Sequence, residues 1–176
     1  MATRKALDKG LEKLEKQRLG LLERLGKFAP EQLALKPASG GWSVGQVITH
    51  MALVEEGSLA YLRKKYGGGR HSPVGVSSVA RLLLLNGALA SPIKFKAPAT
   101  VNKVPFLIYA EAVAKWELIR GDMIGTYARI KDEHIGHDLF KHPSLGRFDL
   151  VQALSFIHAH HKRHLGQIDR ILRSSI

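Results

Sequence analysis

The stretch DLVQALSFIHAHHKRHLGQIDRILR, residues 149–173, joins a clear helical pattern to four of the nine histidines of the chain. Its apolar residues recur at intervals of three and four, as on the buried face of an amphipathic α-helix. Asp149 can cap the free backbone N–H groups at the start, while the side chain of Gln152, three residues on, bonds back to it. The pattern predicts a helix from Asp149 to about Arg173.

The histidines of this helix differ in the face on which they lie. His160 and His164 are four residues apart and are therefore separated by only about 40° around the helix, so both imidazoles can reach one metal ion. His161 lies on the neighbouring face with several leucines, and periodicity does not exclude it. Gln167 follows His164 by three residues, where its amide could bind either the outer ring nitrogen of His164 or a substrate.

Three other segments show the helical period: residues 4–27, residues 43–65 and a segment that follows Pro105. The second of them opens on the same kind of capping pattern, formed by Ser43 and Gln46. No alternation of the β type is long enough to indicate a strand.

Residues 66–105 separate the second and third of the long helices. They contain a short predicted helix at 77–90 and a connection at 92–98 that holds two prolines and cannot lie inside a helix. The sequence therefore predicts one all-α domain over residues 1–176, a four-helix bundle with a long central crossover.

A third metal ligand is expected from a helix that faces the last one. His50 is the one histidine within any other predicted long helix, and it shares an apolar face with Met51. With His160 and His164 it would give a divalent ion such as zinc three imidazoles and an open position.

The competing interpretation is a basic surface patch whose histidines are solvated, but burying unpaired imidazoles on an apolar face is costly. The other histidines lie in predicted loops and are expected in solvent, with His142 a candidate for a pocket rim. They are His71, His134, His137 and His142.

Composition limits the classes of function. Lys and Arg number 27 against 15 Asp and Glu, but in the first helix the two signs alternate, which favours a solvated face over a nucleic-acid partner. No apolar run is long enough to span a membrane. The chain has no cysteine, which excludes disulfides and a thiolate nucleophile, and no secretory signal is evident. A cytoplasmic protein is expected.

Two segments, GWSVGQVITH at residues 41–50 and HHKRHLGQI at residues 160–168, together with the loop at 142–148, resemble the DinB-like (YfiT-like) metal-binding bundle proteins. The resemblance implies an up-down-down-up four-helix bundle that is often a homodimer. It also implies that His50, His160 and His164 hold zinc or nickel.

For function, the resemblance implies either a thiol S-transferase or thiol-dependent isomerase or a hydrolase. We therefore expect a metal-dependent enzyme that activates a low-molecular-weight thiol or water against a small-molecule substrate. The alternative is a non-catalytic, metal-stabilised scaffold or binding protein. No general base is assigned, because Glu55 and Asp169 lie five residues beyond a ligand on other faces, and Glu111, Glu117 and Asp122 cannot be ranked.

Overall fold

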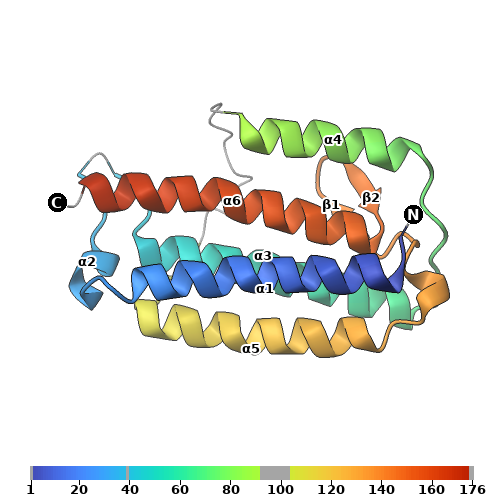
Figure 1. Cartoon of the computed structure of the whole chain (residues 1–176), viewed down its shortest axis with the longest axis horizontal. Helices are drawn as coiled ribbons and strands as arrows, with labels where there is room; N and C mark the ends of the chain where they lie inside the picture. Colours follow the sequence, from blue (N-terminus) through green and yellow to red (C-terminus); the bar gives the residue numbers. More distant parts are fainter. Residues whose placement is uncertain (1, 39, 92–103, 175–176) are drawn as a thin grey trace.

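Four long helices pack together in the computed structural model, which describes residues 2–38, 40–91 and 104–174. Figure 1 shows α1 and α6 running in one direction and α3 and α5 in the other, so the up-down-down-up bundle is confirmed. The long helices are α1 (Arg4–Leu25), α3 (Val44–Gly67), α5 (Tyr109–Ala128) and α6 (Leu150–Ser174). The shorter elements are α2 (Pro30–Ala34), α4 (Ser77–Ala90), the 3-10 turn η1 (Asp132–His134), β1 (Phe140–His142) and β2 (Gly146–Phe148).

Both predicted capping patterns are present. The N–H of Gln46 donates to Ser43 Oγ over 3.3 Å, and the N–H of Ser43 donates to Gln46 Oε1 over 3.2 Å. At α6 the N–H of Gln152 donates to Asp149 Oδ1 over 2.8 Å, and Gln152 Oε1 accepts from the N–H of Asp149 over 3.1 Å. These local bonds begin α3 and α6 at the predicted positions.

The buried faces of the long helices follow the helical period that the sequence shows. In α1 the buried leucines are spaced seven or four residues apart. In α5 three large side chains at intervals of seven and four residues are almost completely buried. The buried members of the two stripes are Leu7, Leu14, Leu21 and Leu25 of α1 and Trp116, Met123 and Tyr127 of α5.

The helix α4 carries the crossover. Because α3 and α5 are parallel, the chain has to return along the bundle between them, and α4 makes this return while packing on the outside of α6 (Figure 1). Two hydrogen bonds from α6 hold α4 at its ends. Gln152 Nε2 donates to Ser78 Oγ over 2.8 Å near the start, and Arg163 Nη1 donates to the carbonyl of Leu89 over 3.1 Å near the end. The predicted helix at 77–90 is confirmed, whereas the proline-containing connection at 92–98 lies outside the described residues.

Two elements were not predicted from the sequence, namely the short helix α2 and the β-hairpin that precedes α6. The helix α2 begins with Pro30 at its first position, which suits the fixed φ of proline, and it buries Leu33. The strands β1 and β2 form an antiparallel hairpin in which Phe140 pairs with Phe148. Gly146, with φ +81°, occupies the left-handed conformation that the turn requires. None of the helices in the described ranges is long and apolar enough to cross a membrane.

The close approach of α1 and α6 depends on Gly10. A Cβ at this position would lie 2.8 Å from Leu154 Cδ1 and 3.3 Å from Leu154 Cβ. We expect Gly10→Ala to lower the free energy of unfolding by up to about 2 kcal/mol, because overpacking against the buried Leu154 outweighs the gain in helix propensity. A Cβ at Gly20, in the same helix, would have no atom within 4 Å. Gly20→Ala is therefore expected to raise the free energy of unfolding by up to about 1 kcal/mol. Urea unfolding checks both, and equal effects would contradict the close contact.

Candidate metal centre

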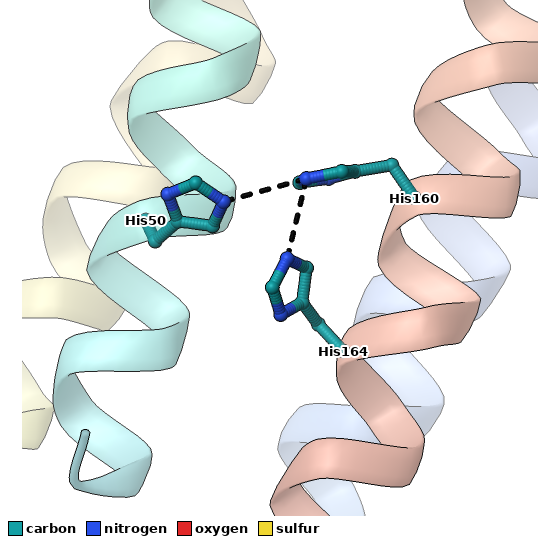
Figure 2. Close-up of side chains that lie close together, drawn as sticks. All are labelled: His50, His160 and His164. Atoms are coloured by element: carbon teal, nitrogen blue, oxygen red, sulfur yellow. Dashed lines mark hydrogen bonds between the residues drawn. The ribbon is translucent and has the colours of Figure 1, made fainter. Parts of the chain in front are cut away.

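Three imidazoles from two facing helices converge inside the bundle. His50 projects from α3 toward His160 and His164, which lie one turn apart on α6 (Figure 2). The Nε2 atom of His160 lies 3.3 Å from Nε2 of His50 and 3.2 Å from Nε2 of His164. The structure thus brings together the three residues that the sequence analysis selected as metal ligands.

The spacing of these nitrogens suits a metal ion. Two nitrogens bound to one tetrahedral zinc ion at about 2.0–2.1 Å lie about 3.3–3.4 Å apart, close to the two separations found here. One ligand atom of each histidine lies within 4.8 Å of the others, a group that could hold an ion. The donor set of three imidazoles is one that zinc and nickel accept.

Burial disfavours the protonated form of all three rings. Burial, with a smaller contribution from His164, lowers the pKa of His50 to about 4. Burial also holds the pKa of His160 well below its ordinary value and lowers the pKa of His164. Because a metal binds the deprotonated imidazole, little proton competition opposes an ion at neutral pH. The Nδ1 of His160 is buried without a hydrogen-bond partner in the described part of the chain.

Gln167 orients one of the three rings. Its Oε1 lies 2.8 Å from Nδ1 of His164. Since a carbonyl oxygen only accepts, Nδ1 of His164 carries the proton and the lone pair of Nε2 points at the other two histidines. Of the two roles that the sequence left open for Gln167, the geometry shows the contact with the outer ring nitrogen.

Aromatic side chains flank the site. The indole of Trp42 has its centroid 4.9 Å from the ring of His50, and the ring of Phe156 is 5.7 Å from that of His160. His142 packs edge-on against Phe156 at 5.0 Å, beside the site. Its Nδ1 accepts bonds from the backbone N–H groups of the hairpin turn, so His142 organises the turn that borders the triad.

His161 belongs to a different group from its two neighbours. It is fully buried, and its Nε2 lies 3.5 Å from Oε1 of Glu55. The guanidinium of Arg120 holds both oxygens of Glu55, through a 3.0 Å bond from Nε to Oε2 and a second bond from Nη2 to Oε1. Glu55 and Arg120 are themselves almost inaccessible to solvent.

Sequence reasoning missed this buried ion pair, although a signal existed. Glu55 lies four residues after Met51, on the apolar stripe of α3, and Arg120 lies four residues after Trp116 on that of α5. An acid and a base at core positions of two adjacent helices indicate a buried pair, because neither is buried alone at acceptable cost.

The other candidate bases are engaged or exposed. Glu117 pairs with Arg18, Asp122 with Arg63 and Asp169 with Arg24, whereas Glu111 lies on the exposed side of α5. The prediction that the loop histidines are solvated is wrong, because all four of them, His142 included, are half-buried. The rings of His71, His134 and His137 meet one another and are half-buried. The reason is that the loops that carry them pair by backbone hydrogen bonds.

An up-down-down-up bundle of four helices with three histidines turned toward one another in its interior defines a class of helical bundle proteins with a candidate metal centre. The chain belongs to the DinB superfamily, whose family profile matches residues 13–168.

Among solved structures, the fold is similar to that of YfiT from Bacillus subtilis, which is described as a probable metal-dependent hydrolase with an unusual four-helix bundle topology. The TM-score is 0.59 at 17% sequence identity, covering 98% of this chain and 89% of that one. A comparison with curated proteins found no match.

Proposed function

We propose that this chain is a metal-dependent enzyme that holds one zinc or nickel ion through His50, His160 and His164. The convergence of three imidazole nitrogens at about the spacing of a tetrahedral ion supports the proposal. An ion with three histidine ligands keeps an open position and supplies Lewis-acid activation of a thiol or a water. The substrate is a small electrophile, and the thiol is of low molecular weight.

The chain's own residues prepare the site for this chemistry. Gln167 holds the proton on the outer nitrogen of His164, so that the inner nitrogen is available without rearrangement. Trp42 and Phe156 border the rings with apolar surface, which reduces the access of water and strengthens electrostatic interactions within the site.

The contribution of Gln167 can be measured separately. We expect Gln167→Ala to weaken zinc binding by about 10- to 100-fold, because the ring of His164 loses the bond that fixes its tautomer. Gln167→Glu keeps an acceptor oxygen at this position and is expected to retain tight binding. Competition with a chromophoric chelator gives both affinities, and equal affinity of Gln167→Ala and the wild type would contradict the role assigned to this residue.

The proposed activity is tested by metal removal. Protein purified without an affinity tag is assayed against a panel of thiols and electrophiles, and against esters and amides with water alone, before and after treatment with a chelator. We expect turnover to disappear with the metal and to return when zinc or nickel is added. Turnover that survives complete removal of the metal would refute a metal-dependent enzyme.

The second candidate is a non-catalytic, metal-stabilised binding or scaffold protein. It is favoured because these two carboxylates are engaged in ion pairs and are not free to act as a general base. Both oxygens of Glu55 are held by Arg120, and Asp169 is paired with Arg24. Tight metal binding without turnover on any member of the panel would favour this candidate, whereas turnover on any member would exclude it.

The homodimer and the cytoplasmic location stay predictions.

A further inference from the structure

A second group of three histidines lies where two connections of the bundle meet. His71 follows the end of α3, while His134 and His137 lie in the segment between α5 and α6. Figure 1 shows these connections at the end of the bundle where the N-terminus lies. His50 is 17 residues before the end of α3, or about 25 Å at 1.5 Å per residue, so the two groups cannot share an ion.

Backbone hydrogen bonds hold the two connections in register. The N–H of Val74 donates to the carbonyl of Gly136 over 3.0 Å, and the N–H of Asp138 donates to the carbonyl of Ser72 over 2.9 Å. Between these bonds Pro73 pairs with His137 as an isolated antiparallel bridge. The positions of the histidines are therefore set by main-chain pairing rather than by the side chains alone.

The three rings form a triangle much like that of the first site. Their centroids are 4.5 Å apart for His71 and His134, 5.0 Å for His71 and His137, and 5.1 Å for His134 and His137. The corresponding distances in the first triad are 4.5, 4.8 and 5.2 Å. One ligand atom of each loop histidine also lies within 4.8 Å of the others.

The polar atoms of the group are incompletely satisfied. The Nδ1 atoms of His71 and His137 are 2.7 Å apart and can share one proton. The Nδ1 of His134 is buried and has no hydrogen-bond partner among the residues described.

Neighbouring residues support the rings from outside. Tyr66 stacks on His71 with its ring centroid 5.6 Å away. The carboxylate of Asp138 accepts the N–H of Ser72 over 2.9 Å and pairs with Arg147 over 2.8 Å, which fixes the loop next to His137. Such outer contacts are typical of residues that position metal ligands.

We propose that His71, His134 and His137 form a second divalent-metal site that clamps the connection after α3 to the connection between α5 and α6. The ion would replace the bond between His71 and His137, whose nitrogens need to part by about 0.6 Å to reach the spacing of a tetrahedral zinc site. The clamp adds to the backbone bonds and the Ser72–Asp138 bond that join the two segments, and it acts independently of the proposed enzyme site.

The test is zinc binding by four tag-free proteins: the wild type, His137→Ala, His160→Ala and the double variant. After zinc is added and excess is removed by desalting, His160→Ala is expected to retain about one equivalent, and zinc is expected to raise its melting temperature. The double variant is expected to retain none and to show no shift. His158→Ala, which removes a histidine outside both groups, is the control and is expected to bind as the wild type does.

The outcomes separate the two sites. If His160→Ala binds no zinc, or binds as much as the double variant does, the second site is refuted. His134→Ala in the His160→Ala background repeats the test with a second residue, so that a folding defect of His137→Ala cannot decide the result. The zinc content of His137→Ala reports on the first triad alone, so a failure of the proposed function is distinguished from a failure of the clamp.

Discussion

Replacing Glu55 with leucine is expected to lower the free energy of unfolding by about 3–5 kcal/mol. The carboxylate of Glu55 is fully buried and is held through both oxygens by Arg120, which is 1% exposed. Without Glu55 the guanidinium stays in the bundle interior, where Glu15 is the acidic residue that it still contacts among the described residues. Urea unfolding of the metal-free protein measures the loss.

The adjacent residue provides the matched control. Glu56 is exposed and pairs with Lys115 over 3.3 Å at the surface, so Glu56→Leu is expected to cost less than about 1 kcal/mol. The double variant Glu55→Leu/Arg120→Met removes both buried charges and is expected to recover much of the lost stability. Equal losses for the leucine variants at positions 55 and 56 would contradict the structural role of the buried pair.

The buried pair also fixes the relation between the helices that carry the triad. Glu55 and His50 are both on α3, and His161, which approaches Glu55 to 3.5 Å, lies between His160 and His164 in the sequence of α6. From α1, Glu15 reaches Arg120, and Arg18 reaches Glu15. All four long helices thus contribute to one polar cluster, which sets the rotation of α3 and α6 that points the triad inward.

The second large effect is expected at the triad itself. His160→Ala should weaken zinc binding at this site by more than about 100-fold, because even outer partners of a metal ligand contribute about 10- to 100-fold. His160 is the central member, within 3.3 Å of both other ligand nitrogens. The comparison is made in a His137→Ala background, so that the second histidine group does not bind zinc, and affinity is measured by chelator competition.

The control for this comparison comes from the same helix. His158 is two residues from His160 but belongs to neither histidine group, so His158→Ala is expected to leave the affinity unchanged. If the alanine variants at 158 and 160 bind zinc equally well, the triad does not hold the ion.

The sequence predicted the long helices because local chemistry determines them. The capping residues Ser43 and Asp149 satisfy the first free N–H groups of α3 and α6, and these bonds depend only on residues three positions away. Once the start of each helix is set, the period places His50, His160 and His164 on inward faces. The i,i+4 spacing of the last two, with one histidine on a facing helix, was therefore enough to select the triad.

The remaining features depend on contacts that periodicity does not carry. The hairpin has strands of three residues, too short to show alternation, and it is stabilised by packing Phe140 and Phe148 on the bundle. The loop histidines meet because residues 72–74 pair with residues 136–138, more than sixty positions along the chain. The geometry of the buried pair of Glu55 and Arg120 likewise follows from how α3 packs on α5.

The most direct test of the metal centre is a crystal structure of zinc-loaded, tag-free protein with diffraction data collected on both sides of the zinc absorption edge. We expect an anomalous difference peak at about 2.0–2.1 Å from the Nε2 atoms of His50, His160 and His164. The absence of a peak between these three atoms, in crystals that contain zinc in excess, would contradict it.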